Sequence, residues 1–145
     1  MRFLRKATFQ DIDLIYEWAN DGLVRANSFK SEQIPYPDHV EWFNRMMTDD
    51  TVLQYIMMED DIPVGQIRLV IEGDSAEVNY SIASKFRGKG YGHVILQLAQ
   101  DLLRENNPNI HIMIAKVKSD NVPSKKLFEE EGYDLQYLCY SKNIE

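Results

Sequence analysis

Apolar residues recur with two spacings along the chain, and these spacings predict a series of strands and helices. The clearest helix follows residue 92, where apolar side chains three and four positions apart share one face. They are Val94, Ile95, Leu98, Ala99, Leu102 and Leu103. The sequence NNP at residues 106–108 ends this helix. Isoleucines then alternate over residues 110–114, which is typical of a strand with one buried face.

Three further strands are expected before this helix. Residues 51–59 and 62–71 predict two strands joined by a tight connection, and a turn at residues 73–74 leads to a third strand at residues 75–83. Three such strands in succession predict an antiparallel meander. The strand at residues 110–114 enters from a helical crossover, so we expect it to run parallel to the last strand of the meander.

The N-terminal part of the chain predicts a strand and two helices. Residues 2–7 form the expected strand. Thr8 and Asp11 make a Thr-x-x-Asp pattern that is typical of a helix N-terminus, and the amphipathic helix that follows is expected to run through Trp18. A shorter helix is expected at residues 23–26.

Three later elements complete the pattern. Asp38 and Glu41 predict a second capping box and a helix behind it. The apolar face of this helix consists of Val40, Phe43 and Met47. A short helix is expected at residues 123–131, and Gly132 ends it. A final strand is expected at residues 133–140.

The pattern as a whole predicts one α+β domain over residues 1–145, with a mixed, mostly antiparallel sheet and helices on both faces. The net charge of −7 argues against a general nucleic-acid binder, which needs clustered cations. Cys139 is the only cysteine, which excludes an internal disulfide framework, and no Cys/His cluster has metal-site spacing. No signal peptide or membrane-length apolar run is present, so we expect a cytoplasmic protein without a membrane partner.

A glycine-rich, cationic loop joins the meander to the long helix. Residues 80–92 read YSIASKFRGKGYG. Three cations and three glycines gather in it: Lys85, Arg87, Gly88, Lys89, Gly90 and Gly92. Main-chain N–H groups freed by glycines at a helix N-terminus favour a compact anion such as pyrophosphate. The alternative is a tight turn alone, but three glycines alternating with cations favour a ligand.

The order of motifs resembles the GNAT superfamily of acetyl-CoA-dependent N-acetyltransferases. The motifs are R-x-x-G-x-G at residues 87–92, a long helix and a strand, N-x-x-S-x-x-L-F at residues 121–128, and GY at residues 132–133. The resemblance covers essentially the whole chain. It implies the GNAT fold, acetyl-CoA as co-substrate and a small-molecule amine as acceptor.

The same resemblance implies a cofactor site in a cleft where the last meander strand splays from its parallel neighbour. The main chain near Ser81 and Ile82 would bind the pantetheine arm as an added strand does. The loop from Arg87 to Gly92 would hold the pyrophosphate, and Asn121 would contact the cofactor from the other wall. The implied cofactor contacts in the loop and beyond are Arg87, Gly88, Lys89, Gly90, Tyr91, Gly92, Asn121 and Phe128.

Glu77 is similar to the strand glutamate that acts as general base in some members of the family. An ammonium group cannot attack a thioester, so a proton must leave it, directly or through water. The alternative is a solvated carboxylate. Phe128 stands where many members carry a tyrosine that protonates the departing thiolate, and phenylalanine cannot donate a proton. Tyr91, Tyr133 or water are the open substitutes.

Three segments near the N-terminus are similar to the RimJ/RimL-like branch, and to amino-sugar N-acetyltransferases of the pseudaminic acid type in particular. They are EWAND at residues 17–21, VRANSF at residues 24–29 and PYPDHVEWF at residues 35–43. This resemblance implies a UDP-linked 4-amino-4,6-dideoxy sugar as acceptor, with Arg25 and His39 as substrate contacts. The alternative for both is a solvated helix residue.

Other functions stay open at this stage. The acceptor amine can instead belong to a protein N-terminus, a polyamine or an aminoglycoside, and the acidic charge would attract a polycation. The fold can also serve as a non-catalytic acyl-CoA-binding module, which Phe128 favours. Members of the family often dimerise through C-terminal strands, so a homodimer with exchanged strands is a further expectation.

Overall fold

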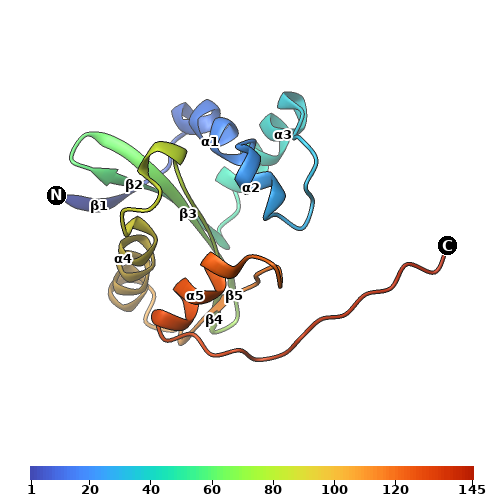
Figure 1. Ribbon diagram of the computed structural model, residues 1–145. Coiled ribbons are helices and arrows are strands. Elements are labelled where there is room, and N and C mark those ends of the chain that lie inside the picture. Colours follow the sequence, from blue (N-terminus) through green and yellow to red (C-terminus); the bar gives the residue numbers. More distant parts are fainter.

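The computed structural model describes residues 1–145 and contains one five-stranded sheet in the order β1-β2-β3-β4-β5 (Figure 1). The strands are β1 Arg2–Lys6, β2 Val52–Glu59, β3 Ile62–Glu72, β4 Ser75–Ile82 and β5 Ile112–Ala115. Neighbouring strands from β1 to β4 are antiparallel, whereas β5 runs parallel to β4. The expected meander, the parallel strand and the α+β class are therefore confirmed.

Helices cover both faces of this sheet, as expected. The helices are α1 Ile12–Ala19, α2 Gly22–Ala26, α3 Tyr36–Met47, α4 Tyr91–Asn106 and α5 Val122–Glu130. Figure 1 shows α1, α2 and α3 grouped on one side of the sheet and α4 and α5 on the other. Two single-turn 3-10 helices, Phe9–Asp11 and Ser84–Phe86, lead into this arrangement.

Each face of the sheet has its own hydrophobic core. The larger core joins β2, β3 and β4 to α4 and α5, and its fully buried members include Met57, Ile67, Leu69 and Ile95. The smaller core joins β2 to α1 and α3 through residues such as Ile56 and Phe43. Burial of this kind is the main favourable contribution to folding. Strand β2 contributes to both cores, and β4 is fixed through Ala76 and Val78 in the larger one.

The expected capping box at Thr8 and Asp11 is confirmed. The Asp11 carboxylate accepts the Thr8 N–H at 2.8 Å, and Thr8 accepts the N–H of Gln10. Arg5 of β1 donates two further hydrogen bonds to Asp11, both of 2.8 Å. The Arg5 guanidinium holds the pKa of Asp11 below its usual value. This carboxylate therefore links β1 to α1.

The second capping box is wrong. Helix α3 already begins at Tyr36, and its N-cap, Pro35, forms no side-chain hydrogen bond. Pro37 lies in the first turn, where the N–H that proline lacks has no partner within the helix. Its buried face is accordingly shifted from the expected one. The buried residues of α3 are His39, Phe43 and Met46.

The final strand expected at residues 133–140 is also wrong. Gly132 ends α5 with a φ of +88°, and the chain beyond it leaves the body of the molecule without pairing (Figure 1). Four large side chains of this segment are exposed: Leu135, Tyr137, Leu138 and Tyr140. An alternating pattern shows that one face needs burial, but it does not show which strand provides the partner.

None of the helices has both the length and the apolar composition that a membrane span requires.

Candidate active site

The sheet opens between β4 and β5. The two strands pair only from Ser75 to Val78 on β4, whereas β4 continues alongside β3 as far as Ile82. The stretch of β4 after Val78 therefore has a partner on one side only. A free strand edge of this kind can hydrogen-bond an extended ligand.

The direction of the main-chain groups on this edge follows from the pairing with β3. Ala83 donates its N–H to the carbonyl of Val64 at 2.8 Å, so the adjoining pair, Gly65 and Ile82, is of the non-hydrogen-bonded type. The main-chain groups of Ile82 consequently point to the opening, whereas those of Ser81 point to β3. Of the two expected pantetheine contacts, the structure brings only Ile82 to the opening through its main chain.

The glycine loop presents a run of unused hydrogen-bond donors. Gly88 and Gly90 have φ angles of +75° and +82°, which favour glycine. The N–H groups of residues 88–93 donate to no acceptor in the protein, and the first bond of α4 runs from Val94 to the carbonyl of Gly90. A Cβ on Gly92 would lie 2.8 Å from the side chain of Leu127, so this glycine lets α4 approach α5. The loop has the donor arrangement of an anion site.

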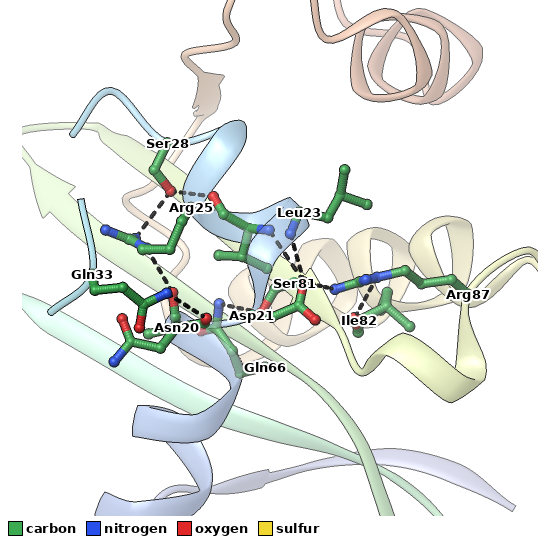
Figure 2. Close-up of polar contacts among 12 residues, drawn as sticks. Asn20, Asp21, Leu23, Arg25, Ser28, Gln33, Gln66, Ser81, Ile82 and Arg87 are labelled. Carbon is green, nitrogen blue, oxygen red and sulfur yellow. Dashed lines mark hydrogen bonds and ion pairs between the residues drawn. The ribbon is translucent and has the colours of Figure 1, made fainter. Parts of the chain in front are cut away.

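Arg87 has a different role from the expected pyrophosphate contact. Its Nη2 atom lies 2.7 Å from the Asp21 carboxylate, and its Nε donates to the carbonyl of Ile82 at 3.1 Å (Figure 2). The Arg87 guanidinium holds the pKa of Asp21 below its usual value. Asp21 also accepts the N–H groups of Leu23 and Val24 at the start of α2. Arg87 therefore joins the end of β4 to the start of α2, and its charge is compensated.

The remaining cations of the loop flank one aromatic ring. The ammonium groups of Lys85 and Lys89 lie 5.7 and 5.8 Å from the ring centroid of Phe86. Neither forms an ion pair with a carboxylate. These two lysines are consequently the cations available to a bound anion.

A cavity of about 430 Å³ lies beside this loop, between α1 and the end of β4. The residues that line it are Glu17, Trp18, Asp21, Ile82, Ala83, Ser84, Lys85 and Arg87. Its lining comes from two segments that are distant in sequence, residues 17–21 and residues 82–87. We call this cavity the cleft.

The other wall of the opening is held by α5. Asn121 caps this helix, because its Oδ1 accepts the N–H of Ser124 at 3.3 Å. The hydroxyl of Tyr80 reaches across from β4 to Ser124 Oγ, also at 3.3 Å. Asn121, an expected cofactor contact, thus lies on this wall and also caps α5 through Ser124.

Phe128 lies in the larger core, so it is not an open cofactor contact as expected. Its ring packs edge-to-face against Tyr80, with the centroids 5.8 Å apart. The sequence analysis missed Tyr80 as a phenol in this region. Of the expected substitutes, Tyr91 donates to Glu59, and burial raises the pKa of Tyr133 to about 12. Tyr80 is the phenol that reaches from β4 to α5, and burial raises its pKa as well.

Glu77 lies on β4 where the pairing with β5 nears its end. Its carboxylate forms an ion pair with Lys116, with an N···O distance of 2.7 Å, and both side chains are exposed. The Glu77 carboxylate raises the pKa of Lys116. Lys116 was not foreseen as this partner, because only the fold brings residues 77 and 116 together.

A row of amide and hydroxyl groups continues across the same face of the sheet. Gln54 donates to Gln66 at 2.8 Å. Gln66 in turn donates to Asn79 and to Ser81, at 3.2 Å in each case. This face of β2, β3 and β4 is therefore polar, and hydrogen bonds connect its side chains from β2 to β4. We call it the sheet floor.

Arg25, an expected substrate contact, has partners within its own part of the chain and does not line the cleft. Its guanidinium donates to the carbonyls of Ala19 and Lys30 and to Ser28 Oγ, at 2.7, 2.9 and 3.0 Å (Figure 2). These bonds fix the loop after α2. The sequence could not reveal this, because main-chain acceptors carry no sequence signature.

His39, the other expected substrate contact, is a core residue and does not line the cleft. Its side chain is buried, and its Nε2 atom lies 2.8 Å from the carbonyl of Ile12. Burial lowers the pKa of His39, which disfavours the charged form. The ring packs between Tyr16 and Phe43. His39 therefore fixes α3 against α1.

Residues 2–134 match the family model described as an acetyltransferase (GNAT) domain. The chain therefore belongs to the GNAT acetyltransferase family, and it is an acetyl-CoA-dependent N-acetyltransferase. No curated protein sequence matches it.

Solved structures show the same fold at low sequence identity. A domain from Methanocaldococcus jannaschii DSM 2661 is 21% identical with a TM-score of 0.80, over 92% of this chain and 88% of that one. Spermidine N-acetyltransferase from Vibrio cholerae, in complex with CoA and spermine, is 22% identical with a TM-score of 0.81, over 90% and 79%. Aminoglycoside acetyltransferase AAC(6')-Ib, in complex with coenzyme A, is 20% identical with a TM-score of 0.81, over 94% and 86%.

The variant Gly90→Ala tests the anion site. Alanine at a φ of +82° is strained, and relief of the strain turns the neighbouring N–H groups away from a common point. We expect the Kd for acetyl-CoA, measured by titration calorimetry, to rise at least about tenfold.

The matched control is Gly73→Ala, which has a similar strain at a φ of +60° but lies in the turn between β3 and β4. Its Kd is expected to match that of the unmodified protein. Equal affinity in Gly90→Ala and Gly73→Ala would show that the loop does not bind the cofactor.

Proposed function

We propose that this protein transfers the acetyl group of acetyl-CoA to the primary amine of a UDP-linked 4-amino-4,6-dideoxy sugar. The observation that carries the cofactor half is the run of unused N–H groups at residues 88–93, beside the free edge of β4. The pyrophosphate of the cofactor would accept from these donors. The pantetheine arm would pair with the main-chain groups of Tyr80 and with the N–H of Ile82, whose carbonyl already accepts from Arg87.

The reaction is a direct transfer within a ternary complex. The amine nitrogen forms a bond to the thioester carbonyl carbon, the carbon–sulfur bond breaks, and the CoA thiolate leaves. Glu77 takes one proton of the ammonium group before the attack, directly or through water, and a second proton leaves the nitrogen to water as the carbon–sulfur bond breaks. The thiolate then gains a proton from water or from Tyr80. Positioning of the two substrates supplies much of the rate.

The charges around the cleft support a sugar nucleotide as acceptor. Glu77 is paired with Lys116, and Asp21 is paired with Arg87. Of the two carboxylates that line the cleft, only Glu17 has no basic partner. A polycation would need several free carboxylates, whereas a sugar needs amide and hydroxyl groups such as those of Asn79 and Ser81, which are accessible on the sheet floor.

A second candidate acceptor is a polyamine or an aminoglycoside. The net charge of −7 favours the approach of a polycation. The neighbours from the solved structures carry such names, with spermine bound in one of them. A protein N-terminus is the remaining amine of this group.

Turnover on a panel of amines tests the proposal, with release of CoA as the readout. We expect acetylation of the UDP-linked 4-amino sugar and little or none of spermidine, kanamycin or a peptide N-terminus. Glu77→Gln removes the proton acceptor, so its kcat is expected to fall by about 10²-fold or more. Its Kd for acetyl-CoA should be unchanged.

Lys116→Gln is the control for loss of the ion pair alone. We expect a much smaller effect on kcat, because Glu77 keeps its carboxylate. Turnover of spermidine in preference to the sugar would establish the second candidate. Cofactor binding without turnover of any amine would establish a non-catalytic acyl-CoA-binding module.

We further propose that the protein is a homodimer in which residues 133–140 pair with β5 of a second copy. The exposed apolar residues of this segment and of β5, such as Tyr137 and Ile112, support it. Strand β5 also lacks a neighbour on its outer side. Edge strands of this kind pair readily with another chain.

Sedimentation equilibrium tests the dimer, with an expected mass twice the 17.0 kDa of one chain. Tyr137→Pro should give a monomer, because proline cannot donate to a strand ladder. Asn143→Pro, which lies outside the pairing segment, should remain a dimer. A monomeric unmodified protein would contradict the proposal.

A further inference from the structure

Arg68 lies at the centre of the polar sheet floor. It is on β3, opposite Gln54 of β2 and Asn79 of β4 in the strand register. Its guanidinium lies against the ring of Trp42 from α3, with the carbon Cζ 5.0 Å from the ring centroid. The side chain is half-buried, so a ligand on this face can reach it.

The guanidinium of Arg68 has no hydrogen-bond or ion-pair partner in the protein. The other six arginines each have one. They are Arg2 with Glu59, Arg5 with Asp11, Arg25 with main-chain carbonyls, Arg45 with Glu41, Arg87 with Asp21, and Arg104 with Asp101. Burial lowers the pKa of Arg68, which shows that its charge is poorly solvated. A planar group with five free donors is suited to a carboxylate or a phosphate.

The nearby carboxylate of Glu77 does not serve as the partner of the Arg68 guanidinium. Glu77 raises the pKa of Arg68 through its charge, but it is not within ion-pair distance of it and pairs with Lys116 instead. Glu72 lies on the same face of β3, and its carboxylate also raises the pKa of Lys116. Neither Glu72 nor Glu77 forms an ion pair with the guanidinium of Arg68, which therefore stays available to an anionic group of the acceptor.

The cofactor does not supply this anion. The free N–H groups of residues 88–93 lie at the start of α4, which packs on the face of the sheet opposite to Trp42. Figure 1 shows α3 and α4 on opposite sides of the sheet. The phosphates of the cofactor and the group bound by Arg68 are therefore separate.

We propose that Arg68 is a specificity-determining residue that binds a phosphate group of the acceptor, with Trp42 holding the plane of its guanidinium. This inference rests on the proposed function, and it assigns the nucleotide part of the acceptor to a particular side chain. The guanidinium donates two parallel hydrogen bonds to the phosphate. The amine at the other end of the sugar is then directed to the opening between β4 and β5.

The first test measures, by titration calorimetry, the binding of UDP to protein that is saturated with CoA. Arg68→Lys keeps the charge but loses the fork, and Arg68→Gln loses both. Because hydrogen bonds between charged groups contribute strongly to binding, we expect the Kd for UDP to be about 10- to 100-fold higher in Arg68→Gln. The Kd of Arg68→Lys should lie between that of Arg68→Gln and that of the unmodified protein. The Kd for acetyl-CoA should stay the same in both variants, which also shows that they fold.

Arg104→Gln is the matched control, because Arg104 is exposed on α4 and pairs only with Asp101. It should bind UDP as the unmodified protein does. Equal UDP affinity in Arg68→Gln and Arg104→Gln would overturn the proposal.

The second test uses turnover of a matched pair of acceptors, the UDP-linked 4-amino sugar and its methyl glycoside without phosphate. The unmodified protein should prefer the former in kcat/KM, and Arg68→Gln should lose most of this preference through a higher KM. Turnover of both acceptors without preference would overturn the role of Arg68 and leave acetyl transfer intact. Absence of turnover on every amine would instead refute the proposed function, and with it this role.

Discussion

The function depends on main-chain hydrogen-bonding groups that the fold leaves unused beside one opening in the sheet. Strand β4 loses its partner after Val78, and the loop from Gly88 gives six successive N–H groups no acceptor. Such groups are almost always paired when they are away from water. Here they adjoin one opening in the sheet, on two elements that the larger core holds rigidly. An extended chain ending in a pyrophosphate satisfies both sets of groups at once.

Ion pairs hold this opening in shape, and they leave few free charges beside it. Arg87 connects the end of β4 to the start of α2 through Ile82 and Asp21, and Lys116 engages Glu77. The loop retains Lys85 and Lys89 as free cations. Arg68 is the one arginine without a partner, and it lies on the face of the sheet that α3 covers. The loop before α4 and the side chain of Arg68 on β3 are thus two separate positive regions.

Local patterns predicted the fold and the cofactor loop, but not the contacts that depend on distant main chain. Alternation gave the meander, and glycine spacing gave the loop, because both signals lie within a few residues. The structural partners of Arg25 and His39 could not be predicted, because they are main-chain carbonyls, which every residue carries. The prediction of a strand near Tyr137 was wrong, because an alternating pattern does not show which strand would pair with it. Arg68 was overlooked, because one arginine on an alternating strand is typical of a solvated face.

The central claim is that the main chain from Ile82 to His93 binds the cofactor, and amide chemical shifts test it most directly. Titration of isotope-labelled protein with CoA should shift the N–H resonances of Gly88, Gly90 and Gly92 strongly, because each gains a phosphate acceptor or adjoins one. The amide of Gly73, in a turn between strands, should stay in place. Saturable CoA binding that leaves the three glycine amides unshifted would contradict the account.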